Sequence, residues 1–136
     1  MSNYATENLR TLALVGHGSC GKTTLIEAML YRAGMIPEMG SIQRGTTMCD
    51  NDLLEKEVGH SIRLAVAHID TAMTDLTPVR IHILDTPGYP DYLGQDMSAL
   101  DAVKSVCAVI DPTKGPELLT RRLMAMAKER GLCRMI

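Results

Sequence analysis

The chain has 136 residues, a formal net charge of −2, and neither tryptophan nor phenylalanine. This length suits one domain with a real core, and the near-neutral charge argues against a surface that coats nucleic acid. No apolar run reaches the length of a membrane span, and residues 1–7 are polar, without a hydrophobic signal core. We therefore expect a cytoplasmic domain with no direct DNA binding and no membrane insertion.

The four cysteines are scattered and form no C-x-x-C pair. The sequence therefore predicts neither a disulfide framework nor a zinc site. Cys107 and Cys133 lie in apolar runs and are interpreted as buried thiols. Cys20 lies inside a glycine-rich loop, where a plain filler role is favoured over redox chemistry.

The first third of the chain predicts a strand, a helix and a long loop. An apolar run over 9–15 predicts a buried strand, and 22–32 predicts a helix that ends at Gly34. Residues 35–59 show no sustained period. A loop of that length in a compact domain is usually functional or mobile.

The middle of the chain predicts a hairpin. Residues 61–70 alternate as a strand does, which places Ile62, Leu64 and Val66 on one face. A second strand is predicted over 79–84 after a short turn, and this short link favours antiparallel pairing. His68 and His82 are then expected to face each other, although two histidines alone do not predict a zinc site.

The last third adds helices over 92–103 and 117–130 and strands over 106–110 and 132–136. We expect the helices to pack through apolar side chains at helical spacing: Leu93, Met97, Leu100, Val103, Leu118, Leu119, Leu123 and Met126. This alternation predicts an α/β fold with a doubly wound, mostly parallel sheet and one antiparallel edge hairpin. Such sheets bind ligands at the carboxyl ends of their strands.

The strongest signal is the run from Gly16 to Thr23, which matches G-x-x-x-x-G-K-[ST] between a predicted strand and a predicted helix. In this arrangement backbone N–H groups surround a polyphosphate and the helix N-terminus adds its positive dipole end. Lys22 would reach the β- and γ-phosphates, and Thr23 would ligate Mg²⁺. The residues expected to bind nucleotide here are Gly16, His17, Gly18, Ser19, Cys20, Gly21, Lys22, Thr23 and Thr24.

A second signal, Asp85-Thr86-Pro87-Gly88, directly follows a predicted strand. Asp85 would hold Mg²⁺ directly or through water. The N–H of Gly88 would face the γ-phosphate, because no Cβ blocks the approach. Taken alone, the segment could equally be an ordinary Pro-Gly turn. Its spacing from the phosphate loop favours the nucleotide site.

Residues 16–24, 50–62 and 85–88 together resemble the GTP-binding domain of translational GTPases. The nearest branch is elongation factor G, with its elongation-factor-G-like paralogues and the tetracycline-resistance ribosome-protection proteins. The resemblance implies a P-loop NTPase (G domain) fold, GTP and GDP as substrate and product, Mg²⁺ as cofactor, and the ribosome as partner. In the family's first switch, roughly D-x₅-E-x-E-R-G-I-T-I, a threonine ligates Mg²⁺ and senses the γ-phosphate. Ser61 stands in its place and keeps the hydroxyl.

The chain departs from the family pattern at several positions. The family has a histidine that positions the attacking water where this chain has Tyr89. The resemblance thus implies a catalytic set of Lys22, Gly88 and Tyr89, in which a phenol must orient the water or hydrolysis is slow. His60 fills a switch position where the family has an apolar residue, and we expect it to be exposed. Ser19 stands where the family often has an aspartate.

The guanine-reading motif N-K-x-D is absent, and residues 132–136 correspond to the strand that precedes it in the family. We therefore expect residues 1–136 to be a single G domain, truncated before its last strand. Preference for guanine over adenine rests on the resemblance alone.

The leading hypothesis is a GTP-hydrolysing switch that acts on the ribosome. The alternative is a non-hydrolysing nucleotide-binding or interaction module, or a truncated remnant, because of Tyr89 and the missing motif. An ATP-using P-loop enzyme is a third, less favoured hypothesis.

Overall fold

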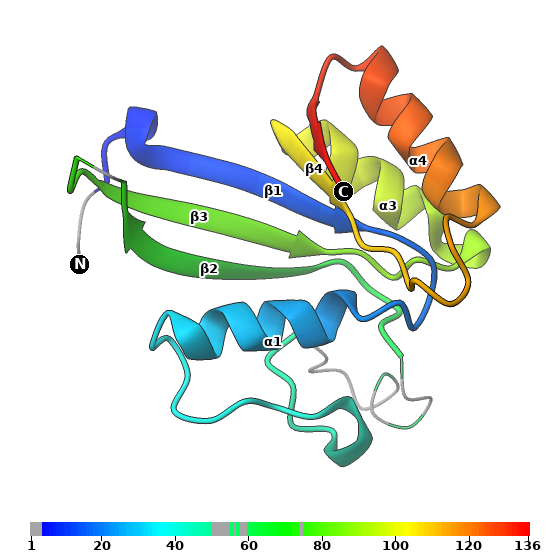
Figure 1. Cartoon of the computed structure of the whole chain (residues 1–136), viewed down its shortest axis with the longest axis horizontal. Coiled ribbons are helices and arrows are strands. Elements are labelled where there is room, and N and C mark those ends of the chain that lie inside the picture. Colours follow the sequence, from blue (N-terminus) through cyan, green and yellow to red (C-terminus); the bar gives the residue numbers. More distant parts are fainter. Residues whose placement is uncertain (1–3, 50–54, 56, 58–59, 74) are drawn as a thin grey trace.

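The computed structural model describes residues 4–49, 55, 57, 60–73 and 75–136. Among these residues, a five-stranded sheet with the order β2-β3-β1-β4-β5 forms the centre (Figure 1). The strands are β1 (Leu9–Val15), β2 (Ala65–Ala72), β3 (Pro78–Asp85), β4 (Ser105–Ala108) and β5 (Cys133–Met135). The β2–β3 pair is antiparallel, and β1 pairs in parallel with β3 and β4, as β4 does with β5. The predicted α/β sheet with an antiparallel edge hairpin is confirmed.

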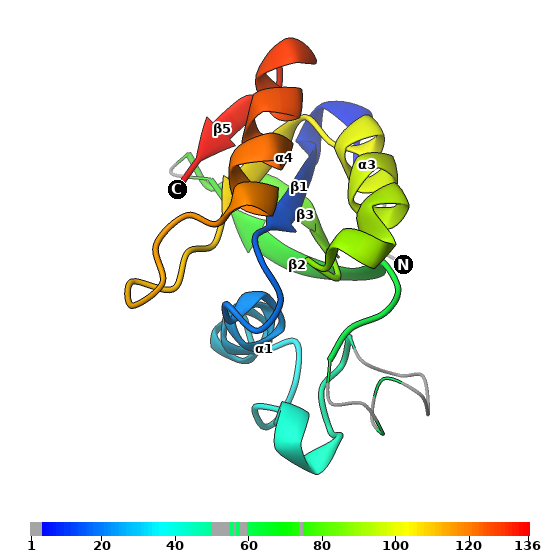
Figure 2. The same ribbon diagram turned by 90° about the vertical axis from the view of Figure 1, so that its right-hand side faces the viewer.

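Helices cover both faces of this sheet (Figure 2). Helix α1 (Lys22–Arg32) lies on one face, and α3 (Leu93–Ala102) and α4 (Leu118–Glu129) lie on the other. Short 3₁₀ turns complete the described elements at Thr6–Asn8, Ile42–Arg44 and Pro90–Tyr92. Among the described residues, no helix combines the length and the apolar character that crossing a bilayer requires.

The side chains of β1 alternate between two separate cores. Leu14 packs with Ile26 and Leu30 of α1, whereas Ala13 and Val15 belong to the cluster under α3 and α4. This division follows from the two-residue period of a strand. Because β1 packs against both cores, the position of its carboxyl end is well defined, and so is the start of the loop that follows it.

The observed bounds of β1 and α1 coincide with the predicted 9–15 and 22–32. The strand predicted over 61–70 begins only at Ala65 and extends to Ala72. Its alternation is real, but the core takes the face that carries Ala67 and Ile69, and Val66 is 63% exposed. Ala67 belongs to the cluster under α1, whereas Leu64, just before β2, is partly buried against the cluster under α3 and α4.

Several predicted core residues point to solvent instead. Leu118 is 83% exposed and Met97 is 36% exposed. Helix α4 turns Thr120, Leu123 and Ala127 inward, and their spacing places Leu118 on another face. Cys133 was predicted to be buried and is exposed on edge strand β5, while Cys107 is partly buried.

Candidate nucleotide-binding site

The loop after β1 is organised around the ammonium group of Lys22. Its Nζ donates hydrogen bonds to the carbonyl oxygens of Gly16 (3.1 Å) and His17 (2.8 Å). Lys22 is only 5% exposed, and its Nζ lies 3.8 Å from the Sγ of Cys20. Burial raises the pKa of the Cys20 thiol, and Lys22 acts in the opposite direction. One positive charge is thereby held at the centre of a loop of backbone amides.

Three side-chain oxygens from separate segments meet beside this loop. Thr23, in the first turn of α1, donates its hydroxyl to Oδ2 of Asp85 at the end of β3 (2.6 Å). The hydroxyl of Ser61, which precedes β2, lies 3.3 Å from that of Thr23. All three residues are buried. Hard oxygen ligands of this kind suit Mg²⁺, which needs few protein ligands when phosphate and water complete its shell.

The turn at Gly88 closes directly over the phosphate loop. Gly88 has a φ of 76°, and a Cβ at this position would overlap the Gly16 carbonyl oxygen and the Nζ of Lys22. Only glycine fits both constraints. The Thr86 hydroxyl donates to the Leu14 carbonyl oxygen (2.8 Å) and ties the turn to β1. The turn and the lysine therefore face the same small space.

Behind the turn lies Asp96, which is fully buried in α3. Burial raises the pKa of its carboxyl, while the Thr86 hydroxyl, the Gly88 N–H and the charge of Lys22 act in the opposite direction. Neither oxygen of this carboxyl has a hydrogen-bond partner among the described residues. No sequence pattern singled it out.

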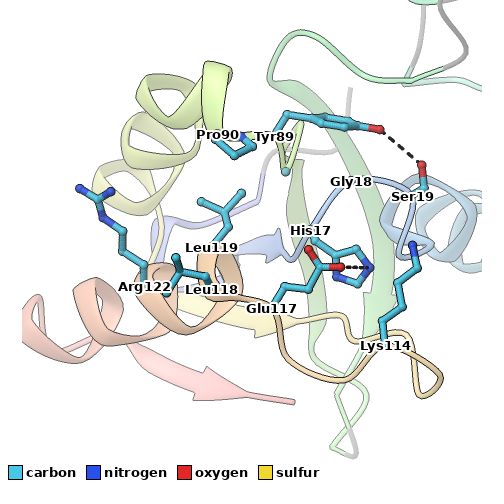
Figure 3. A pocket seen from close by; sticks show the side chains of 11 residues that line it. His17, Gly18, Ser19, Tyr89, Pro90, Lys114, Glu117, Leu118, Leu119 and Arg122 are labelled. Atoms are coloured by element: carbon cyan, nitrogen blue, oxygen red, sulfur yellow. Dashed lines mark hydrogen bonds and ion pairs between the residues drawn. The ribbon is translucent and has the colours of Figure 1, made fainter.

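Tyr89 lies between the phosphate loop and the segment before β2. A Cβ on Gly18 would overlap the Tyr89 ring, and the Tyr89 hydroxyl is 3.4 Å from the Oγ of Ser19 (Figure 3). The ring of His60 lies on Tyr89, with centroids 4.5 Å apart and planes tilted by 40°. His60 is thus partly buried, and the prediction that it is exposed is wrong. Tyr89 itself prevents full solvent access to it.

Two cavities border these residues. The larger, of about 510 Å³, is lined by His17, Tyr89, Glu117 and Arg122 among others and opens between the loop and α4 (Figure 3). In it, the Nε2 of His17 lies 3.5 Å from Oε1 of Glu117, so this side chain faces α4. The smaller, of about 40 Å³, has Lys22 and Ser61 in its wall. This volume is large enough to hold water.

Glu27 was missed by the sequence analysis. It is 1% exposed, and its carboxylate accepts hydrogen bonds from the N–H groups of Gly40 (2.9 Å) and Met48 (2.5 Å). It thereby fastens the long loop to α1. The available signal was its position one helical turn after Thr23, on the same face.

Glu55 holds the far end of the same loop. Its Oε1 accepts from the N–H groups of Ile62 (2.9 Å) and Arg63 (3.0 Å), directly after Ser61. Within the predicted switch segment 50–62, residues 50–54, 56 and 58–59 lie outside the described residues.

The structure brings the predicted residues of the loop together with Ser61, Asp85, Gly88 and Tyr89 at the carboxyl ends of β1 and β3. Two of the predicted residues, Ser19 and Thr24, are exposed, and Thr24 lies on the surface of α1.

The model of the elongation factor Tu GTP-binding domain matches residues 7–136. The chain belongs to this family. It is 34% identical over 121 residues to the tetracycline resistance protein TetM from transposon Tn1545 of Enterococcus faecalis, covering 89% of this chain and 18% of that protein. It is 35% identical over 127 residues to peptide chain release factor 3 of Streptococcus uberis, covering 90% of this chain and 24% of that protein.

Solved structures of this family share the fold. A Thermus thermophilus protein superposes with a TM-score of 0.82 and 35% identity, over 90% of this chain and 18% of that one. A bacterial selenocysteine-specific elongation factor gives a TM-score of 0.69 and 25% identity, over the same shares. The chain thus spans about a fifth of the length of these relatives. The resemblance to translational GTPases that the motifs indicated is confirmed.

Proposed function

We propose that residues 1–136 form the GTP-binding and GTP-hydrolysing G domain of an elongation-factor-G-like translational GTPase, a Mg²⁺-dependent switch that acts on the ribosome in the cytoplasm. The observation that carries this proposal is the meeting of three hydroxyl and carboxylate oxygens, from Thr23, Ser61 and Asp85, beside the buried ammonium of Lys22. Three segments far apart in the sequence supply the groups that a magnesium triphosphate needs.

Each group has one task. Lys22 neutralises charge on the β- and γ-phosphates, and the backbone N–H of Gly88 meets the γ-phosphate. Thr23, Ser61 and Asp85 would hold Mg²⁺, which would shield the charge of the phosphates. Ser61, through Mg²⁺, and Gly88, through its N–H, both depend on the γ-phosphate. Loss of the γ-phosphate would therefore release both segments.

The choice of guanine and of the ribosome rests on the relatives. The family is defined by a GTP-binding domain, and the relatives include a peptide chain release factor and a selenocysteine-specific elongation factor. The names of these relatives refer to protein synthesis, which supports GTP rather than ATP as the nucleotide and the ribosome as the partner. The guanine-reading motif itself does not occur in this sequence.

Titration of the chain with GDP, GTP and ATP, with and without Mg²⁺, tests this proposal. We expect Mg²⁺ to strengthen the binding of GTP, and we expect little discrimination between GTP and ATP by this chain, because the guanine-reading motif does not occur in it. Lys22→Ala should weaken GTP binding at least about tenfold through loss of a charge that faces phosphate. Lys128→Ala, which removes the same charge from an exposed position on α4, is the matched control. No effect of Mg²⁺ on GTP binding, or equal losses of affinity in Lys22→Ala and Lys128→Ala, would contradict the proposal.

A second candidate function is passive nucleotide binding without turnover. It is favoured by Tyr89, which stands where the family has the water-positioning histidine and whose hydroxyl lies beside Ser19. GTP turnover measured with and without ribosomes separates the two. Phosphate release that ribosomes stimulate supports the switch, and tight binding without release supports the passive module.

A further inference from the structure

The small cavity beside Lys22 is bordered by a histidine, His60, although the residue after Gly88 is Tyr89 and not a histidine. His60 and Tyr89 line this cavity together with Lys22, Thr23 and Ser61. His60 comes from the segment before β2, not from the turn after β3. Its ring contacts Tyr89 at a centroid distance of 4.5 Å.

Tyr89 is already engaged by the phosphate loop. Its ring occupies the space in which a side chain on Gly18 would lie, and its hydroxyl is directed at the Oγ of Ser19, 3.4 Å away. Because its ring packs on Gly18 and its hydroxyl lies at Ser19, the Tyr89 side chain serves as a support on which the His60 ring rests. It leaves the task of holding a water to another group.

The contact that His60 makes with the backbone suits one tautomer of its neutral ring. Nδ1 lies 3.3 Å from the carbonyl oxygen of Ser61. A carbonyl oxygen can only accept, so Nδ1 carries the proton, and the Nε2 of the neutral ring keeps its lone pair. A neutral imidazole with this lone pair can accept a hydrogen bond from a water O–H.

We propose that His60 is a catalytic residue that supplies, from the first switch, the imidazole that the Gly88 turn lacks. This inference rests on the proposed GTPase function. Nε2 accepts a hydrogen bond from the attacking water, while the ring rests on Tyr89 and Nδ1 stays on the Ser61 carbonyl. Because the Nδ1 of His60 is hydrogen-bonded to the carbonyl oxygen of Ser61, His60 can hold the water only when the segment of Ser61 is ordered at the site. Hydrolysis therefore depends on an ordered first switch.

The step that His60 assists is a simple displacement. The water oxygen forms a bond to the γ-phosphorus, and the bond from that phosphorus to the β–γ bridging oxygen breaks. The electron pair of the broken bond stays on GDP, and both water protons end on dihydrogen phosphate. His60 orients the water and gains no proton.

The test compares three variants with the wild type: His60→Leu, His60→Gln, and His68→Leu as control. His68 is exposed on β2, away from the cavity, and undergoes the same chemical change. At saturating GTP and Mg²⁺ we expect His60→Leu to lower kcat by about 10²-fold, with KM within about twofold of the wild type. His60→Gln keeps an acceptor oxygen and should recover part of the loss, and His68→Leu should match the wild type.

A binding measurement gives a second, independent readout. GDP with aluminium fluoride mimics the transferring phosphoryl group and its water, so it should bind the wild type more tightly than GDP alone. His60→Leu should lose that fluoride-dependent gain and retain its affinity for GDP. Circular dichroism establishes that each variant is folded.

Three results would overturn the inference. His60→Leu could hydrolyse GTP as fast as the wild type, which shows that the water is held elsewhere. It could hydrolyse GTP faster, which shows that the stack on Tyr89 obstructs the cavity. The wild type could bind GTP yet show neither turnover nor a fluoride effect, which refutes the role of His60 and leaves nucleotide binding intact. A folded wild type that binds no nucleotide refutes the proposed function itself.

Discussion

The contact between Gly18 and Tyr89 predicts a strong energetic coupling between these two positions. Gly18 has no left-handed φ, so its backbone accepts alanine, and the three atoms nearest to an added methyl group all belong to the Tyr89 ring, which it would overlap. Gly18→Ala should therefore destabilise the wild-type chain by about 1–2 kcal/mol, the lower part of the range for overpacking, because the partly exposed ring can shift.

The sign should reverse when the ring is absent. In a Tyr89→Ala background, Gly18→Ala meets no obstacle and lowers the entropy of the unfolded chain, which should stabilise the protein by about 0.4–1 kcal/mol. The coupling free energy between the two positions is then about 1.5–3 kcal/mol. Urea denaturation followed by circular dichroism on the four proteins of the cycle measures it.

Additive effects would refute this reasoning. If Gly18→Ala costs the same in both backgrounds, the loss comes from the loop backbone and not from the ring. Tyr89 would then not pack on the phosphate loop, and it could not support the ring of His60.

Three further predictions concern residues around the site. Tyr89→Ala should change the Kd for GDP by less than about twofold, because its hydroxyl contacts the exposed side chain of Ser19 and the hydrogen bonds of Lys22 do not involve it; a tenfold loss in a nucleotide titration would contradict this. Glu27→Ala removes the acceptors of two N–H groups and should destabilise the chain by about 2–4 kcal/mol, with faster amide exchange at Gly40 and Met48; unchanged exchange there would count against it. Because burial raises the pKa of Asp96, the folded state binds its proton more tightly than the unfolded chain does, so this carboxyl costs stability above its unfolded pKa. Asp96→Asn should therefore be more stable than the wild type at pH 7, with the gain lost below about pH 4, and equal denaturation midpoints at pH 7 would refute it.

The parts of the fold that depend on local pattern could be predicted from the sequence. The strand over 9–15, the phosphate loop and the helix over 22–32 follow each other directly, and each has its own signal in periodicity or glycine spacing. The short turn between β2 and β3 was enough to predict their antiparallel pairing.

Which face is buried could not be predicted, because it depends on partners distant in the sequence. Residues 61–70 alternate, but only the position of α1 decides that Ala67 and not Val66 turns inward. Leu118 has an apolar side chain at helical spacing, yet the inward face of α4 carries Leu123.

The contacts of the candidate site were partly beyond prediction for the same reason. Residue identity and family resemblance pointed to Thr23, Ser61 and Asp85. No local signal placed the His60 ring on Tyr89, because these residues belong to different segments that meet only in the folded chain. The role of Glu27 depends on two N–H donors, of Gly40 and Met48, that lie far from it in the sequence.

Helix α1 works as a rigid strut between two regions. Its first turn carries Thr23, and one turn later Glu27 grips the amides of Gly40 and Met48. A helix of this length resists bending, so a small slide along its axis moves both attachment points by the same amount. A ligand that displaces Thr23 along the helix axis therefore also displaces the loop segment that is hydrogen-bonded to Glu27. This coupling requires no chain of side-chain contacts between the two positions.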